Sequence, residues 1–468
     1  MLYSLRLDLG GTAPAGHGRS LLSELHLSDA HVIDTASPAR CEWVELLGQD
    51  PHWAPLLHMH RPYEALAHWT LAAHVERARQ RGAASGSNRP FDLAISTGDN
   101  IDNAQQNELD TYLRIMAGGT ARISAVGGVH QPSTELGPGP WPFWCPDASV
   151  QDSWKPLGYA PVDNFVARVG AEIRSQGFGF AWASLPGNHD FMRQGTALLN
   201  PAIEAIAVGS AKTLARPPDL WPDDVRTRFV QDPAAFSAGT TRQILADPAR
   251  AGLDRRAWVA AHIARGASGL GAQHALDGSA DTWIDTEHAR FILLDTNHPG
   301  GDFEGSIGTA QLAWLADRLT EVDKERSGRF AVICSHHGSV SLTNTLGDDP
   351  ERRHAAQLTA LVHRHPCVVA WLVGHRHLHR ITPQPGPSGG FWEITTGSLI
   401  DWPCQARTVE FFRHDNGSME IVCTLQDHEA APDSLAGLHL TMARRFAGRT
   451  ATHMQGQPID GNTRLIRP

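Results

Sequence analysis

The sequence predicts an α/β protein whose buried strands end at one shared polar edge. Five short apolar runs, rich in β-branched residues, are typical of buried strands. Each run stops at Asp, Asn or His, and stretches between the runs carry apolar residues at helical spacing. In an open α/β sheet, ligands bind outside the carboxyl ends of the strands. We therefore expect the run ends to meet; they lie at residues 25–31, 95–100, 185–190, 332–337 and 372–377.

The polar side chains that follow these runs indicate a metal site. They are carboxylates, an amide and imidazoles, a set that suits Mn, Fe or Zn better than a structural zinc bound by cysteines. There are enough of them to hold two ions. One carboxylate that bridges two metals about 4 Å apart is the arrangement that activates a hydroxide and holds a phosphoryl group during in-line displacement.

The order of the motifs resembles that of the calcineurin-like metallophosphoesterases. That superfamily carries D-x-H, G-D-x-x-D/N, G-N-H-D/E, a His that closes an apolar strand, and G-H-x-H. The corresponding stretches here are residues 29–31, 98–102, 187–190, His336 and 374–377. The resemblance covers roughly residues 20 to 425, without the long insertions between the motifs.

The resemblance implies a dinuclear centre with defined ligands. Either two divalent ions or a mixed-valence pair of Mn, Fe or Zn would fit it. Asp99 would bridge the two ions. One ion would be held by Asp29, His31 and His377, and the other by Asn188, His336 and His375.

Two of these ligand assignments compete with neighbouring residues. Glu24 and His26 also imitate the first motif, but they lie inside the apolar run that Asp29 follows. His336 is preferred to His337 because the superfamily's ligand comes three residues after the last aliphatic residue of the strand, here Ile333.

The resemblance also implies the catalytic group. His189 would assist the leaving oxygen, and Asp190 would orient His189. Three further residues are candidates for contact with the substrate, namely Arg40, Asn103 and His337.

The remaining segments complete an α/β sandwich of two packed, mixed β-sheets flanked by helices, with long insertions. We expect helices over 62–80, 105–116, 255–265 and 309–319, and further strands over 289–295, 391–396, 408–413 and 418–425. Asp415-Asn416-Gly417 predicts a hairpin turn between the last two strands. Residues 1–430 would form one catalytic domain, with insertions at about 117–157 and 195–281. The tail, 431–468, would be partly helical and packed on the domain.

The first insertion is rich in Gly, Pro and Trp. A loop of this length in a compact domain is usually functional or disordered, and its aromatic residues argue against disorder. Trp141, Trp144 and Trp154 would either wall the substrate pocket or plug the insertion onto the core. We expect the wall.

Composition excludes several other classes of protein. A net charge of −10 over 468 residues disfavours binding to long nucleic acids, which usually needs a basic surface. The six cysteines are scattered without paired spacing, so no disulfide framework is expected. The chain has no apolar leader at its start and no run of 18 apolar residues. We expect a cytoplasmic protein without a membrane segment that acts on a small phosphorylated substrate.

The predicted function is metal-dependent hydrolysis of a phosphoric ester, with a phosphodiester favoured. A hydroxide that bridges the two metals would attack phosphorus, and His189 would assist the departure of the leaving oxygen. The alternatives are a phosphomonoesterase, a nucleotide pyrophosphatase and a non-catalytic scaffold of the same fold. A scaffold usually lacks a ligand or the catalytic His, and neither is missing here.

Overall fold

The computed structural model describes residues 2–468 except 15, 17, 125–140, 326 and 451–454. Its first main sheet has seven strands. Their spatial order is β1 (Ser4–Arg6), β21 (Thr463–Arg467), β20 (Met419–Gln426), β19 (Ala406–Arg413), β2 (Arg19–Leu27), β3 (Leu93–Ser96) and β6 (Trp182–Ser184). Strands β2, β3 and β6 are parallel, whereas β19, β20 and β21 pair antiparallel.

The second main sheet has six strands. Their order is β11 (Thr282–Asp285), β12 (Ala289–Leu294), β14 (Phe330–Ser335), β16 (Val368–Val373), β18 (Phe391–Thr395) and β17 (Arg380–Gln384). The four central strands are parallel and the two edge strands are antiparallel to their neighbours. Within the described part of the chain, four two-stranded sheets lie outside the two main sheets. They are β4 (Gly119–Ala121) with β5 (Ile173–Ser175), β7 (Met192–Arg193) with β8 (Ala197–Leu198), β9 (Ala211–Thr213) with β10 (Thr241–Gln243), and β13 (Ile307–Gly308) with β15 (Arg352–Arg353).

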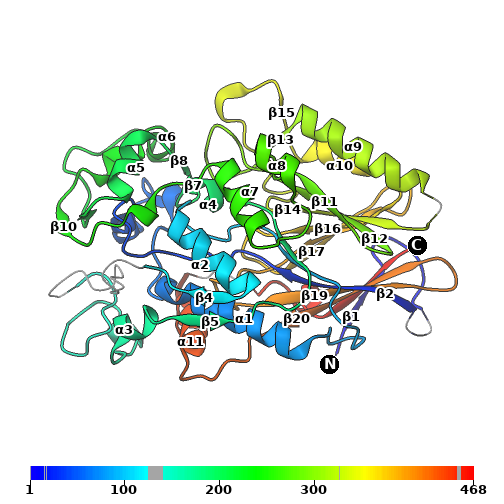
Figure 1. The fold of residues 1–468 in the computed structure, drawn as a ribbon, viewed down its shortest axis with the longest axis horizontal. Coiled ribbons are helices and arrows are strands. Elements are labelled where there is room, and N and C mark those ends of the chain that lie inside the picture. Colours follow the sequence, from blue (N-terminus) through cyan, green and yellow to red (C-terminus); the bar gives the residue numbers. More distant parts are fainter. Residues whose placement is uncertain (1, 15, 17, 125–140, 326, 451–454) are drawn as a thin grey trace.

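The two main sheets pack face to face and helices cover their outer faces. Apolar residues from β2, β3, β12, β14 and β16 share one buried cluster between the sheets. The outer face of the first sheet is covered by α1 (Ala67–Arg81), α2 (Gln106–Ala117) and α7 (Arg255–Ala264), and that of the second by α9 (Thr309–Lys324) and α10 (Ala355–Val362). The prediction of two packed, mixed sheets flanked by helices is confirmed (Figure 1).

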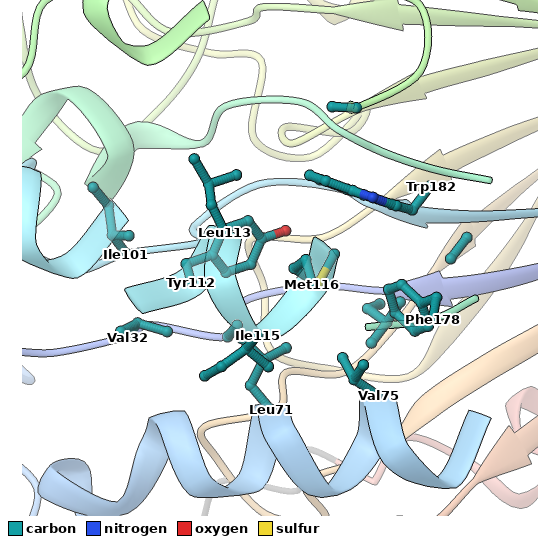
Figure 2. Close-up of a cluster of buried hydrophobic side chains, with 14 of the residues drawn as sticks. Val32, Leu71, Val75, Ile101, Tyr112, Leu113, Ile115, Met116, Phe178 and Trp182 are labelled. Atoms are coloured by element: carbon teal, nitrogen blue, oxygen red, sulfur yellow. The ribbon is translucent and has the colours of Figure 1, made fainter. Parts of the chain in front are cut away.

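The helix α1 shows how the sequence produces this packing. Its apolar residues at helical spacing, Leu71 and Val75, point toward α2 and the first sheet, where Val32 and Ile115 meet them (Figure 2). The helix ends at Gly82, whose φ of 63° is the left-handed conformation that terminates helices and that glycine adopts without strain.

The long insertions and the chain beyond residue 430 have their own elements. Short helices lie at α3 (Phe165–Val169), α4 (Asn188–Phe191), α5 (Pro201–Ala207), α6 (Val225–Gln231) and α8 (Ala272–Asp277). Beyond residue 430, α11 (Leu435–Thr450) contacts α1, and β21 is inserted between β1 and β20. The sequence did not predict this last strand. None of the described helices is long and apolar enough to cross a membrane.

Candidate metal centre and active site

The five strand ends named from the sequence meet at one edge of the sandwich. Strands β2, β3 and β6 of the first sheet lead directly to Asp29, Asp99 and Asn188. Strands β14 and β16 of the second sheet lead to the remaining histidines. The site therefore lies at the carboxyl ends of parallel strands from both sheets, where open α/β folds bind their ligands.

The backbone is strained where it delivers these side chains. Positive φ angles between 43° and 66° occur at five residues of the site, which are Asp29, His31, Asp99, His375 and His377. Such angles are uncommon for residues other than glycine, and they persist where the surrounding structure enforces them. Two backbone hydrogen bonds enforce them here: the amide of Asp29 donates to the carbonyl of Gly98 at 3.0 Å, and that of His31 donates to the carbonyl of Asp99 at 2.9 Å.

One group of donor atoms comes from Asp29, His31 and His377. Nε2 of His377 lies 3.1 Å from Oδ1 of Asp29 and 3.3 Å from Nε2 of His31. Oδ2 of Asp99 lies 3.6 Å from Nε2 of His31. Two ligands about 2.1 Å from one ion, at angles between a right angle and the tetrahedral angle, are about 3.0–3.4 Å apart, so this spacing fits a shared cation.

A second group of donor atoms surrounds Nε2 of His336. It lies 3.0 Å from Oδ1 of Asn188, 3.2 Å from Oδ2 of Asp99 and 3.3 Å from Nδ1 of His375. The amide of Asn188 is oriented by its Nδ2, which donates to the carbonyl of Gly195 at 2.9 Å, so its oxygen faces the other donors. Oδ2 of Asp99 therefore lies between the two groups.

The hydrogen atoms of three of the imidazoles point away from the centre. Nδ1 of His31 donates to Asp102 at 3.0 Å, Nδ1 of His377 donates to Asp401 at 2.7 Å, and Nδ1 of His336 donates to the carbonyl of Thr97 at 2.7 Å. Their Nε2 atoms thus face the ligand atoms of the other residues, where each can bind either a proton or a cation.

A bound cation would satisfy this group of ligand atoms. Oδ1 of Asp29 is buried and lies 3.1 Å from Nε2 of His377, as expected for two atoms that would share an ion. Hydrogen bonds from the second ring nitrogen to a carboxylate or a carbonyl are the usual way to orient histidines that bind metals. For His375 the carboxylate nearest to its second nitrogen is Glu304, at 3.7 Å.

The electrostatics of the centre also favour positive charge. Burial opposes protonation of His377, but Asp29 and Asp401 outweigh it and raise the pKa of the imidazole to about 10. Burial likewise opposes protonation of His336, and Asp99 outweighs it and raises the pKa to about 9. Despite its burial, Asp99 keeps a pKa well below its ordinary value because of the imidazoles around it. The centre therefore attracts cations, and its N and O donors suit divalent transition metals.

Comparisons with known proteins bear on the family. No family model matches the chain. A probable cyclic nucleotide phosphodiesterase from Synechococcus sp. (strain WH7803) is 34% identical over 88 residues, which are 19% of this chain and 32% of that protein. A manganese-dependent ADP-ribose/CDP-alcohol diphosphatase from Xenopus laevis is 28% identical over 107 residues, which are 22% of this chain and 28% of that protein. The chain thus matches about a third of the length of these curated relatives.

Among solved structures, a dimetal phosphatase from Danio rerio has a TM-score of 0.43 at 13% identity, over 87% of this chain and 97% of that one. That likeness is too remote to argue from. The ordered motifs, their convergence on one edge and the two sequence relatives all agree with the resemblance to the calcineurin-like metallophosphoesterases.

The residue that orients His189 is not the one expected. Nδ1 of His189 lies 3.0 Å from the carbonyl oxygen of Asp102 and 3.1 Å from its Oδ1. Asp190 instead accepts from the backbone N–H of Gly187 and Asn100, from the Asn100 amide and from the Trp258 indole. The expectation that Asp190 orients His189 is therefore wrong, because α4 turns the Asp190 carboxylate into the core.

Two of the three expected substrate residues are buried in structural contacts. Arg40 is 1% exposed and pairs with Glu42, Glu64 and Asp102. Asn103 is fully buried, and its amide donates to Glu108 at 2.6 Å. Neither side chain reaches the substrate pocket, so both expectations are wrong. Arg40 instead helps to fix Asp102.

His337 also has both ring nitrogens engaged. Nδ1 accepts from the hydroxyl of Thr296 at 2.9 Å, and Nε2 donates to the carbonyl of Phe303 at 2.9 Å. Its ring lies 4.5 Å from that of His375. No nitrogen is left for a substrate, so His337 supports His375 and does not contact the substrate as expected.

A pocket of about 260 Å³ opens over the centre. Its floor includes Asp99, Asn188, His189, His375 and His377. Its walls come from segments that the sequence did not single out, and they comprise residues 55–59, Arg61, Gln194, Thr196, Phe303 and Arg376. Only the position of Arg376, between the two histidines of the last motif, gave a signal in the sequence.

The tryptophans of the first insertion do not wall this pocket. Trp144 is fully buried against Phe165, with ring centroids 5.1 Å apart, and Trp154 stacks on Phe446 of α11 at 6.2 Å. Trp141 pairs with Asp152 within the insertion. Residues 125–140 of the insertion lie outside the described residues. Trp144 and Trp154 therefore anchor the insertion onto the core, contrary to expectation.

Proposed function

We propose that the protein is a metal-dependent hydrolase of small phosphoric diesters. The observation that carries this proposal is the pair of donor groups on either side of Asp99, next to a histidine that lines the same pocket. Two divalent ions held there would supply the positive charge that activates water and neutralises phosphoryl oxygens. Asp29, His31 and His377 would hold one ion, Asn188, His336 and His375 the other, and Asp99 both.

The chain's own residues account for the proton that the leaving group needs. Asp102 holds Nδ1 of His189, which leaves Nε2 as the atom that can exchange a proton with the substrate. Burial opposes protonation of His189, but Asp99 and Asp102 outweigh it and raise its pKa. His189 would therefore donate a proton to the departing oxygen.

The pocket supports a diester over a monoester. Its wall at residues 55–59 offers apolar side chains, Leu56, Leu57 and Met59, to a second substituent on phosphorus. One curated relative is named as a cyclic nucleotide phosphodiesterase and the other as an ADP-ribose/CDP-alcohol diphosphatase, and neither is named for a monoester. These features support the diester but leave the monoester and the nucleotide pyrophosphate as alternatives for the test.

The test is turnover of a substrate panel by protein loaded with Mn. The panel comprises p-nitrophenyl mono- and diesters, cyclic nucleotides and nucleoside diphosphate conjugates, with metal content measured in parallel. We expect the highest kcat/KM with a diester, and a loss of turnover in His189→Ala. A preference for monoesters would overturn the diester assignment. Protein that holds two ions and hydrolyses nothing in the panel would overturn the hydrolase proposal.

A further inference from the structure

The pocket contains two guanidinium groups that differ in their partners. The guanidinium of Arg61 donates two hydrogen bonds to the carboxylate of Asp401, from Nε at 2.7 Å and from Nη2 at 2.9 Å. Arg376 has no carboxylate within hydrogen-bond distance among the described residues, and the nearest, Glu304, lies 3.6 Å away. Arg61 is therefore part of the support for His377, whereas the donors of Arg376 are available to a ligand.

Arg376 also differs from its neighbours in depth. Its side chain is 49% exposed, whereas those of His375 and His377 are 8% and 11% exposed. All three line the pocket. Arg376 thus lies at the rim, above the floor where the reacting phosphoryl group would bind. A guanidinium at this position would contact a part of the substrate beyond the reacting phosphorus.

Glu304 is the carboxylate that faces Arg376 when no substrate is bound. Its Oε2 is buried without a hydrogen-bond partner among the described residues. Glu304 is only 17% exposed and does not line the pocket, and Arg376 is the cation next to it at 3.6 Å. The guanidinium therefore stands between this carboxylate and an anion that enters the pocket.

We propose that Arg376 is a specificity residue that binds a second anionic group of the substrate, such as a phosphate, beyond the reacting phosphorus. This inference rests on the proposed hydrolysis of diesters and goes beyond it by assigning charge to the non-reacting part of the substrate. A guanidinium suits this role because its planar fork donates two parallel hydrogen bonds to phosphate or carboxylate oxygens.

The test compares esters that differ in one anionic group. Thymidine 5′-(p-nitrophenyl phosphate) is the parent, and the charged probes are its 3′-phosphorylated derivative and its diphosphate counterpart. Wild-type protein loaded with Mn should prefer a charged probe by about 10- to 100-fold in kcat/KM, the worth of one charged hydrogen-bonded contact. In Arg376→Gln this ratio should fall to near one, through KM, and Arg376→Lys should restore part of it.

The control is Arg380→Gln, which removes an exposed arginine outside the pocket and should keep the wild-type ratio. Metal content measured in all variants separates binding of the probe from damage to the centre. If the wild type hydrolyses the parent but shows no preference that depends on Arg376, the inference is overturned and the proposed function stands. If none of the three esters is hydrolysed by protein with bound Mn, the proposed function fails and the inference fails with it.

Discussion

Oδ1 of Asp102 lies 3.1 Å from Nδ1 of His189, although the two residues are far apart in the sequence. The same oxygen accepts from Nδ1 of His31 at 3.0 Å, and the two imidazole rings lie 4.4 Å apart. Arg40 binds the other carboxylate oxygen. One buried carboxylate thus holds both a proposed metal ligand and the proposed proton donor.

We expect Asp102→Asn to lower activity by about 10- to 100-fold, because residues that orient the ligands of a metal are typically worth that much. Steady-state kinetics measure the effect. Asp190→Asn is the comparison, because its carboxylate accepts hydrogen bonds from four N–H groups within the core and does not contact His189. It should change the rate little in protein that folds and holds its metal. If Asp190→Asn instead reproduced the kinetic defect in a stable protein, the assignment of Asp102 would be wrong.

His189→Ala should keep the metal content of the wild type and lose about 10²- to 10⁴-fold in rate, the usual worth of a positioned proton donor. His375→Ala should lose metal, because its Nδ1 lies within the second donor group. Elemental analysis and kinetics on both variants separate the two roles. Equal loss of metal in both would show that His189 is a ligand.

Trp144→Ala should destabilise the protein by about 3–5 kcal/mol, the usual cost of truncating a fully buried aromatic residue. The KM for a small diester should change little, because Trp144 does not line the pocket. Denaturant unfolding measures the loss of stability, and steady-state kinetics measure the KM. Trp221→Ala is the matched control, because that ring is 55% exposed. A large change in KM with unchanged stability would indicate that Trp144 lines the substrate pocket, as the sequence led us to expect.

The strands, the main helices and the convergence of the polar strand ends could be predicted because they are local or ordered features of the chain. Apolar runs that end in polar residues mark the strands, and the spacing within each motif survives folding. The contacts of Asp190, Arg40 and Asn103 could not be predicted, because they depend on how α4 and the loops after β2 and β3 turn. Asp102 belonged to a motif, but only the fold brings it to His189.

The role of the tryptophans was mispredicted for a related reason. Chain order places the first insertion between two strands that end at the site, but it does not specify the direction in which the insertion leaves them. The insertion packs on α11, which follows residue 430, so a contact between distant segments decided the outcome. The walls of the pocket come from loops of low periodicity, for which the sequence offered no pattern.

Glu24 predicts a dependence of stability on pH. Burial raises its pKa well above the ordinary value, so the folded state keeps the proton that the unfolded state releases. Stability from this residue is therefore lost as pH rises above the unfolded pKa, up to the raised folded pKa. Glu24→Gln should match the wild type at low pH and gain melting temperature over it as pH rises. Glu287→Gln, at a side chain that is 85% exposed, should show no such gain. A constant difference between Glu24→Gln and the wild type would contradict the raised pKa.

The number of metal ions bound per chain tests the central claim most directly. Protein dialysed against excess Mn and then freed of unbound metal should hold two ions per chain by elemental analysis. Asp99→Ala should lose both, because its Oδ2 lies between the two donor groups, whereas Asp317→Ala, on an exposed face of α9, should keep both. One ion per chain in the wild type, or two ions retained in Asp99→Ala, would contradict a dinuclear centre bridged by Asp99.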